Sequence, residues 1–347
     1  MRILKLTAII ILLSAYVLIK IPGAVLLLKP YGIDLYSLGD LYRYSYLSAY
    51  RDTTQTVPFP PKKSKQNIRL FVLGDSFTAS FTSGHYRGVR SLSYANWNQA
   101  SEQKFAIQTD ATDQNILLIS CSEKNIRLRF SKSQINAYLA KKEKCVNIGF
   151  QLTEKPLNAA AFLKKYLGRP EISDQNIQAL LFENEMALQI KELKASFNKR
   201  VFGKIATEVE EYPEENMLFQ KLTTDSQYVF MSSFKTIEKT EEDELIEGMK
   251  RMVMHYKSTG IDSIIFSFIP NPVSMIAPKF KNQTYNQLIY KLEQRITETG
   301  GGCISVLGDF KQQNAKVYRR GDTHWNAKGA EMWLQKVNAA LEACCRK

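Results

Sequence analysis

Short apolar runs alternate with longer amphipathic stretches through most of the chain from residue 67 onward. The apolar runs are rich in β-branched and aromatic residues, which predicts buried strands near residues 69–73, 105–108, 115–121, 262–268 and 303–306. Between several of them, apolar residues at helical spacing predict helices over residues 131–142, 241–258 and 284–299. This alternation predicts an α/β fold: a parallel sheet in a three-layer α/β/α arrangement, with helices on both faces.

Residues 150–240 interrupt this pattern. A long helical periodicity runs from 174 to 202, and a polar, acidic segment follows at 208–215. We therefore expect a helical insertion that covers one edge of the sheet or the mouth of a site. Structural cover and a role as a lid or docking element both remain open.

The amino terminus has a different composition. Residues 7–19 are almost wholly apolar and follow Arg2 and Lys5, and a second apolar stretch covers residues 21–28. Together they reach the roughly 20 residues that cross a bilayer. We predict an uncleaved membrane anchor over residues 1–28, with the amino terminus in the cytoplasm and the remainder outside it. A cleaved signal peptide is the alternative, and in either case the rest of the chain is exported.

Residues 29–66 separate this segment from the predicted domain. Six tyrosines lie between residues 31 and 50, and a proline-rich stretch follows at 57–61. Tyrosine is common at bilayer surfaces, because its ring is apolar and its hydroxyl group binds water. The pattern favours a juxtamembrane stalk, and an ordered segment that packs on the domain is the alternative.

Length and charge narrow the classes of partner. The 347 residues allow one large domain or two modest ones, and we assign residues 67–347 to a single domain with the insertion at 150–240. The chain carries 47 Lys and Arg residues against 34 Asp and Glu residues, a formal charge of +13. For an exported protein this charge favours an anionic partner, such as an acidic polysaccharide, a cell-wall polymer or lipid head groups. Nucleic acid is not expected, because the basic residues are dispersed.

The cysteines indicate no metal site. They are five in number and lack the spacing of metal ligands: Cys121, Cys145, Cys303, Cys344 and Cys345. We expect Cys121 to be buried at the end of a strand, whereas pairing of Cys303 with Cys344 or Cys345 stays open. No sequence feature indicates a cofactor.

The first candidate for chemistry is Ser76, in the motif Gly-Asp-Ser-Phe at 74–77. The motif directly follows the apolar run that ends at Leu73, and ligands of open α/β sheets bind at the carboxyl ends of strands. A helix that begins near Phe77 would direct its first amide groups at an oxyanion beside Ser76. The alternative is that Asp75 or Ser76 only caps that helix.

The second candidate is His324, in the motif Asp-Thr-His-Trp-Asn at 322–326. The chain has only two other histidines, His85 and His255. In an extended segment residues two apart point the same way, so that the Asp322 carboxylate would reach Nδ1 of His324. Nε2 would then be left to accept a proton from serine. Helical periodicity from about 326 to 343 places this motif on the loop that opens the last helix.

These motifs resemble those of the SGNH, or GDSL-type, hydrolase superfamily, and within it the alginate O-acetyltransferase-like branch. The resemblance rests on the two motifs above, on Ile-Pro-Asn-Pro at 269–272, and more weakly on residues 116–125. The serine motif precedes the Asp-x-His motif here, which is the ordinary order of the superfamily but not of the alginate enzymes. The resemblance implies a flavodoxin-like sheet, with Ser76 as nucleophile, His324 as base and Asp322 as the acid that orients it.

The resemblance also implies oxyanion or substrate contacts from asparagine. Asn125, Asn96 and Asn271 are the candidates, although none has a clean flanking motif. A structural role is the alternative for Asn125. We expect Glu123 and Lys124 to be surface charges.

Taken together, these features predict an O-acetyltransferase or acetylesterase that acts on a glycan. We expect the protein to lie in the bacterial cell envelope, with a periplasmic domain attached to the inner membrane. The resemblance, the predicted anchor and the basic charge all favour this location. A transferase would need an acetyl group from across the membrane, so the resemblance implies a membrane-bound O-acyltransferase as partner. The alternative from another class is a glycan-binding or scaffolding module without catalytic activity.

Overall fold

The computed structural model describes residues 7, 35–52, 67–97, 107, 109–139 and 184–344. The chain divides into two compact units. One contains Met1–Thr53 and Gln151–Ala206, and the other contains Thr54–Phe150 and Thr207–Lys347. The second unit holds a parallel sheet and both of the motifs singled out above.

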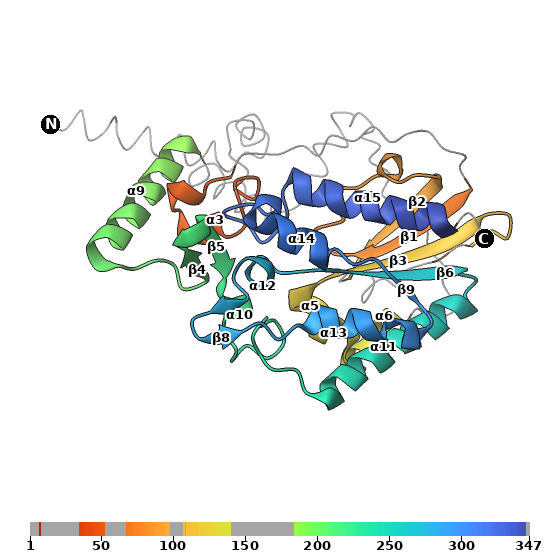
Figure 1. Cartoon of the computed structure of the whole chain (residues 1–347). Coiled ribbons are helices and arrows are strands. Elements are labelled where there is room, and N and C mark those ends of the chain that lie inside the picture. Colours follow the sequence, from red (N-terminus) through yellow and green to blue (C-terminus); the bar gives the residue numbers. More distant parts are fainter. Residues whose placement is uncertain are drawn as a thin grey trace. The chain divides into compact units, whose positions relative to one another are not determined.

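The sheet has five strands, all parallel to their neighbours (Figure 1): β1 (Ile68–Gly74), β2 (Val89–Asn96), β3 (Gln114–Ser122), β6 (Ser263–Ile269) and β9 (Gly302–Cys303). Their order is β2-β1-β3-β6-β9. The chain therefore moves outward from β1 to β2 and then crosses to the other side of β1 to form β3. In a doubly wound sheet this reversal opens a crevice at the carboxyl ends of β1 and β3, where ligands bind.

The predicted parallel α/β sheet is confirmed, with differences at its edges. The strands expected at 69–73, 115–121 and 262–268 form β1, β3 and β6. The strand expected at 303–306 is shorter and ends at Cys303, and most of the run at 105–108 lies outside the described residues. Strand β2 was not predicted. Only Val89 and Ala95 of its sequence, VRSLSYAN, are buried, because the strand forms the edge of the sheet, and it therefore lacks the apolar run of a central strand.

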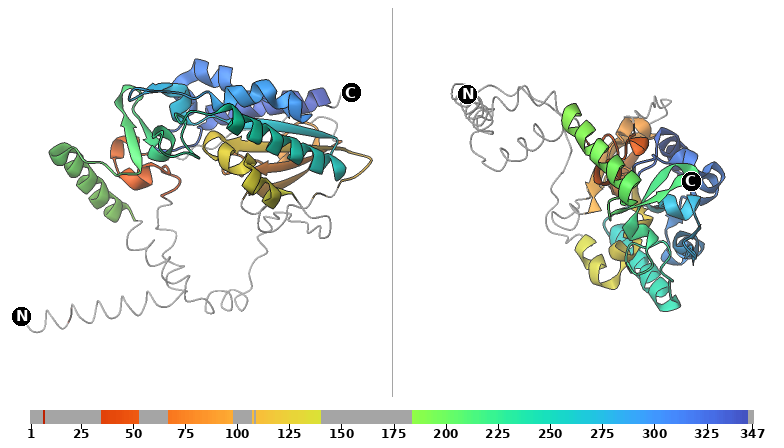
Figure 2. Two further views of the ribbon diagram at one scale, coloured as in Figure 1. Left: turned by 90° about the horizontal axis from the view of Figure 1, so that it is seen from below. Right: turned by 90° about the vertical axis from the view of Figure 1, so that its left-hand side faces the viewer.

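Helices cover both faces of the sheet (Figures 1 and 2). One face packs against α12 (Pro272–Ile276), α14 (Leu307–Gln313) and α15 (Ala327–Cys344). The other packs against α5 (Glu123–Phe130), α6 (Lys132–Tyr138), α11 (Lys239–Ser258) and α13 (Leu288–Arg295). The helices expected at 131–142, 241–258 and 284–299 correspond to α6, α11 and α13. Helix α13 is shorter than expected, because residues 283–284 form strand β8 and Ile296–Thr299 form a 3-10 turn.

The predicted insertion is only partly helical. Helix α9 (Glu185–Phe202) ends where the periodicity ended, and residues 150–183 lie outside the described part. The acidic segment instead forms an antiparallel hairpin of β4 (Val209–Tyr212) and β5 (Met217–Gln220), joined by the 3-10 turn Pro213–Glu215 and followed by α10 (Lys221–Thr224). The hairpin forms because Val209, Met217 and Phe219 bury their side chains. Glu210 and Glu211 are half-buried, and Glu214 and Glu215 of the turn are exposed.

The remaining elements of the second unit are short. They are the hairpin strands β7 (Lys279–Phe280) and β8 (Gln283–Thr284) and the 3-10 turns Ser83–His85 and Asn314–Val317.

The first unit contains α9 and an ordered segment at residues 35–52. This segment forms α3 (Tyr42–Ser45) and the 3-10 turn Ser48–Tyr50, and it packs on Leu188 of α9. Part of the predicted stalk is therefore folded, and residues 53–66 lie outside the described part. Apart from Thr7, so does the predicted anchor at 1–28. Within the described residues, no helix combines the length and the apolar character needed to cross a membrane.

Candidate active site

Ser76 lies in a tight turn at the carboxyl end of β1 (Ile68–Gly74), and its side chain is exposed. The helix expected to begin near Phe77 is absent, because residues 76–80 form successive turns instead. The Asp75 carboxylate explains the difference: Oδ1 accepts the Phe77 N–H at 3.2 Å, which closes a side-chain turn in place of a helical one. The Phe77 amide is thereby occupied. In the described part of the chain, the Ser76 N–H has no hydrogen-bond acceptor.

Gly74 and Asp75 fix the course of this turn. A Cβ atom on Gly74 would lie 2.2 Å from Oγ1 of Thr78, so close approach of the backbone requires glycine. Asp75 is buried, and its Oδ2 accepts the Ser122 N–H at 2.8 Å. This bond joins the carboxyl ends of the neighbouring strands β1 and β3. Asp75 therefore has a structural role here, and the cap considered from sequence becomes a link between strands.

His324 is presented by a loop between a short 3-10 turn and α15. A bridge between Tyr318 and Trp325 closes the loop, and the Asn326 side chain donates to the carbonyl oxygens of Lys316 and Tyr318 at 2.9 and 3.1 Å. The same side chain accepts the Gly329 N–H at 3.1 Å, so it also caps α15. The helix begins at residue 327, as the periodicity predicted to within one residue.

The structure brings Ser76, His324 and Asp322 into one hydrogen-bonded chain. Ser76 Oγ lies 2.7 Å from His324 Nε2, and His324 Nδ1 lies 2.6 Å from Asp322 Oδ1. A carboxylate can only accept hydrogen bonds, so Nδ1 carries the proton toward Asp322, and Nε2 of the neutral ring accepts from the serine hydroxyl. Residues 322–324 form a bend rather than the extended segment expected, because Asp322 Oδ1 also accepts the His324 N–H at 3.0 Å.

Hydrogen bonds and positive charge keep the buried carboxylate of Asp322 ionised. The Asp322 side chain is only 2% exposed, compared with 26% for His324. Burial raises the pKa of Asp322, but the hydrogen bonds from His324, the charge that this ring carries when it is protonated, and the guanidinium of Arg319 outweigh burial and hold this pKa well below its usual range. Arg319 pairs with Oδ2, the oxygen that does not face the imidazole. Arg319 was not predicted, because its only signal in the sequence is a basic residue three positions before the acid.

Aromatic rings support the imidazole. The Phe77 ring lies 4.4 Å from the His324 ring, centroid to centroid, and meets Trp325 edge to face at 5.1 Å. Trp325 is buried and packs on Trp333 of α15. The residues directly after the serine and after the histidine thus form one wall, which restricts the orientation of the ring.

The three asparagines expected near an oxyanion have different environments. Asn96 ends β2 and pairs in register with Gly74, and its side chain bonds to the Tyr94 hydroxyl. Asn125 lies in the first turn of α5, after β3, and donates to Ser122 Oγ at 3.0 Å. Both asparagines therefore lie at the carboxyl ends of the strands that flank β1. Their hydrogen bonds join Asn96 to Tyr94 and Asn125 to Ser122 rather than to Ser76.

Asn271 belongs to a buried polar cluster with Glu123. Its N–H donates to Glu123 Oε2 at 2.9 Å, and its side-chain amide donates to Ser233 Oγ at 3.0 Å. Ser274 also donates to Glu123 Oε2, at 2.6 Å. Burial raises the pKa of Glu123, and these hydrogen bonds oppose that effect. The expectation of a surface charge at position 123 was wrong, because the side chain is 2% exposed, while Lys124 is half-buried and donates to Gln220.

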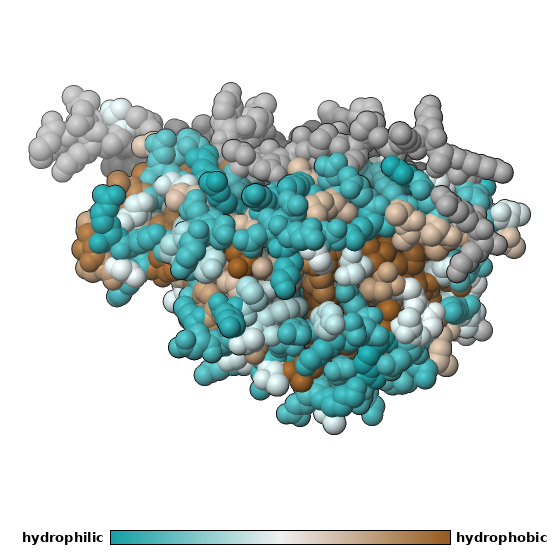
Figure 3. Space-filling model, viewed as in Figure 1, coloured by the Kyte–Doolittle hydropathy of each residue, from teal (hydrophilic) through white to brown (hydrophobic). Residues whose placement is uncertain are grey.

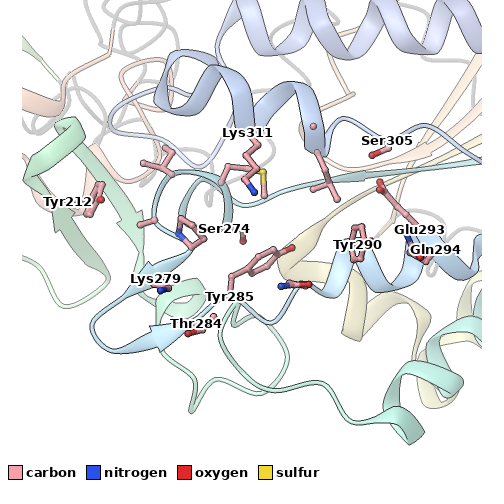
Figure 4. Close-up of a pocket in the computed structure, with 17 residues that line it drawn as sticks. Tyr212, Ser274, Lys279, Thr284, Tyr285, Tyr290, Glu293, Gln294, Ser305 and Lys311 are labelled. Atoms are coloured by element: carbon pink, nitrogen blue, oxygen red, sulfur yellow. The ribbon is translucent and has the colours of Figure 1, made fainter.

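A pocket of about 880 Å³ lies beside this cluster (Figure 4). Residues 274–278, which contain the end of α12 after β6, form its apolar wall. Tyrosine rings from three elements also line it: Tyr212 from β4, Tyr285 after β8 and Tyr290 from α13. Polar contacts are offered by Gln287, Gln294, Thr284, Ser305, Lys279, Lys311 and Glu293. Its size is that of a site for a small organic ligand.

The cysteines in the described residues are free. Cys121 is buried, as expected, and Cys303 and Cys344 carry separate thiols, so these two do not form a disulfide. Burial raises the pKa of Cys303 to about 12. Cys145 and Cys345 lie outside the described residues.

The chain matches no protein-family model, no curated protein and no solved structure. The fold and the candidate site are therefore assigned from the geometry of this chain alone.

Proposed function

We propose that the protein is a serine acyl-transfer enzyme of SGNH type that acts on O-acetyl groups of an extracytoplasmic glycan. The observation that carries the proposal is the hydrogen-bonded chain Ser76–His324–Asp322, with 2.7 Å and 2.6 Å between successive partners. An exposed serine next to an imidazole, which is itself oriented by a buried carboxylate, is the arrangement that activates a hydroxyl group for attack on an ester.

The first step forms an acyl-enzyme. Nε2 of His324 accepts the Ser76 proton as Oγ attacks the acetyl carbonyl carbon, and the carbonyl electrons move onto oxygen. The ionised Asp322 stabilises the imidazolium that results. When the tetrahedral intermediate collapses, the bond from carbon to the alcohol oxygen breaks, and His324 returns its proton to that oxygen.

The second step regenerates the serine. His324 takes a proton from water or from a sugar hydroxyl as the oxygen of that molecule attacks the acetyl carbonyl carbon. The bond from this carbon to Ser76 Oγ then breaks, and His324 returns its proton to Oγ. Water gives acetate and makes the protein an esterase, whereas a sugar gives an acetylated glycan and makes it a transferase. The exclusion of water decides between the two.

Donors for the oxyanion come from the residues around Ser76. The Ser76 N–H is the first candidate. Asn96 ends β2 and Asn125 follows β3, the two strands on either side of β1. A single donor of this kind typically lowers a barrier by about 3 kcal/mol. Asn271 is less suited, since its amide is committed to Ser233.

Charge supports an acidic glycan as substrate. The pocket does not bear on the reaction, because Ser76, His324 and Asp322 are not among the residues that line it. The formal charge of +13 favours an acidic polymer. A transferase in the bacterial envelope, with its domain in the periplasm, would receive its acetyl group from a membrane-bound O-acyltransferase.

The pocket supports a second candidate, a glycan-binding module without turnover, because its tyrosine rings and its amide and hydroxyl groups present the apolar faces and hydrogen-bonding partners that a sugar ring requires. Its aromatic and polar lining does not depend on the serine, so binding there would persist if no acyl-enzyme formed.

A serine-directed fluorophosphonate separates these functions. We expect the full-length protein to be labelled, Ser76→Ala to lose labelling, and His324→Ala to be labelled about 10²- to 10⁴-fold more slowly. Ser80→Ala is the matched control, because Ser80 is an exposed serine in the same turn. Acetate release and acetyl transfer to an added oligosaccharide then distinguish esterase from transferase. Equal labelling of the Ser76→Ala and Ser80→Ala variants, without ester turnover, would contradict the enzyme and favour the binding module.

A further inference from the structure

Helix α9 (Glu185–Phe202) carries an apolar stripe that the proposed chemistry does not use. Five large side chains lie at helical spacing along it and are 55–74% exposed: Met186, Ile190, Leu193, Phe197 and Val201. Figure 3 shows the corresponding hydrophobic patch over α9 at the left of the molecule. Isolated exposed apolar residues are ordinary, but a continuous stripe of this kind marks an interaction surface.

The opposite side of α9 is already occupied. Leu188 is fully buried against Leu35, Leu38 and Tyr42. On the same side, Glu192 accepts a hydrogen bond from the Tyr42 hydroxyl at 2.5 Å, and Glu185 pairs with Arg51 at 3.2 Å. Because successive residues of a helix turn by about 100°, Leu188 points away from the middle of the stripe by about 180°. The apolar stripe therefore faces away from the segment that holds the helix in place.

Both borders of the stripe are basic. Around the helix axis, Lys194 lies about 60° to one side of the centre of the stripe and Arg200 lies about 60° to the other side. Both residues are exposed. The two acids of α9, Glu185 and Glu192, lie on the packed side with partners of their own. Segment 35–52 adds the exposed Tyr36, with the Arg43 guanidinium 3.6 Å above its ring.

We propose that the stripe of α9 lies in the interface of an anionic lipid bilayer. A helix of this kind places its apolar residues about 5–10 Å into the boundary between head groups and acyl chains, while Lys and Arg at its borders reach the phosphates. The predicted membrane segment ends at residue 28, and the segment that packs on α9 begins at residue 35. Seven residues span at most about 25 Å, so a chain anchored there keeps α9 within reach of the bilayer. The inference is independent of the proposed enzymatic activity.

The basic residues beside the stripe disfavour two other binding partners, a second copy of α9 and residues 140–183 of this chain. A second copy of α9 would bring the same two basic borders together, whereas paired helices place opposite charges beside their seam. Residues 140–183 of this chain contain seven Lys and Arg against five Asp and Glu residues, so they also carry the sign of Lys194 and Arg200. An anionic bilayer offers both an apolar layer and the complementary charge.

Photo-cross-linking of the full-length protein in lipid vesicles tests this proposal. p-Benzoylphenylalanine replaces Phe197 in the stripe, where it extends an existing aromatic ring, and it replaces Lys199, an exposed residue on another side of α9, as the control. In vesicles of phosphatidylglycerol and phosphatidylcholine, we expect lipid adducts at position 197 and several-fold fewer at position 199. Lys194→Glu and Arg200→Glu should each reduce the adducts roughly fivefold, because each basic residue near such a surface contributes about 1 kcal/mol. Vesicles of phosphatidylcholine alone should lower them as well.

The cross-linked partner decides the outcome. Adducts from position 197 to a peptide of residues 140–183, or to a second copy of the chain, would overturn the proposal in favour of that occupant. Equal lipid labelling at positions 197 and 199 would also overturn it. Circular dichroism of each variant verifies that the fold is unchanged.

Discussion

Helices α9 and α15 are both 18 residues long and both amphipathic, yet their apolar sides have opposite environments. In α15 the apolar residues Trp333, Leu334 and Val337 are almost fully buried on the sheet. In α9 the large apolar residues are more than half exposed, and Leu188 alone is fully buried. Each helix begins after an asparagine whose side chain accepts a hydrogen bond from the first turn.

The comparison shows that periodicity identifies an apolar side but not what that side contacts. For α15, burial holds the loop that carries His324, because Trp333 stacks on Phe81 and packs on Trp325 next to the histidine. For α9, Leu188 and a few polar contacts hold the helix within the described residues, and its apolar side is exposed. Helix stability in proteins comes mainly from tertiary packing. Truncation of an apolar side chain should therefore destabilise the protein more in α15 than in α9.

Truncation of one apolar residue in each helix gives the largest expected contrast. Trp333→Ala removes a buried indole that donates to Ser267 Oγ at 2.8 Å, and we expect it to lower the free energy of unfolding by about 3–5 kcal/mol. Leu193→Ala removes a side chain that is 72% exposed and should change this free energy by less than about 0.5 kcal/mol. Urea unfolding of both variants in detergent-free solution measures the two effects. A loss at Leu193 as large as that at Trp333 would mean that the stripe packs within the protein.

The two capping asparagines give the next contrast. Asn326→Ala removes the cap of α15 and two hydrogen bonds to the loop that carries His324, so we expect a loss of about 2 kcal/mol together with slower labelling of Ser76. Asn184→Ala removes the bond to the Ala187 N–H alone and should cost about 1 kcal/mol without changing the labelling rate. Fluorophosphonate kinetics and thermal unfolding of both variants give the measurement. Unchanged labelling in Asn326→Ala would show that the loop holds His324 without this residue.

Helix α13 extends the comparison to a partly buried charge. Burial raises the pKa of Glu293 to about 7, although Ser305 and Lys336 oppose the effect. The folded protein therefore holds this proton more tightly than the unfolded chain, and stability falls as pH rises from about 5 to 7. We expect Glu293→Gln to match the wild type near pH 5 and to exceed its stability by about 1–2 kcal/mol at pH 8. Urea unfolding at both pH values tests this, and an equal difference at the two values would contradict it.

The sequence predicted the parts of the sheet that local pattern defines. The runs at 69–73, 115–121 and 262–268 are buried on both faces of a parallel sheet, which produces continuous apolar segments. Edge strand β2 and the β4–β5 hairpin were not predicted, because β2 has few buried residues and the hairpin carries acidic residues. Their pairing with β1 and with each other makes them strands. The N–H of Leu218 in the hairpin, for example, donates to the carbonyl oxygen of Arg320 at 2.8 Å. Arg320 lies in the loop that carries His324.

Residue types and their order along the chain were sufficient to nominate Ser76, His324 and Asp322, because a nucleophile after a strand and a histidine near an acid are local signals. Tertiary structure alone decided that the serine and the histidine lie 2.7 Å apart, that Asp75 links two strands, and that Arg319 holds the far oxygen of the acid. The physical reason is that hydrogen-bond geometry and burial depend on contacts between segments far apart in the chain. No local pattern encodes such contacts.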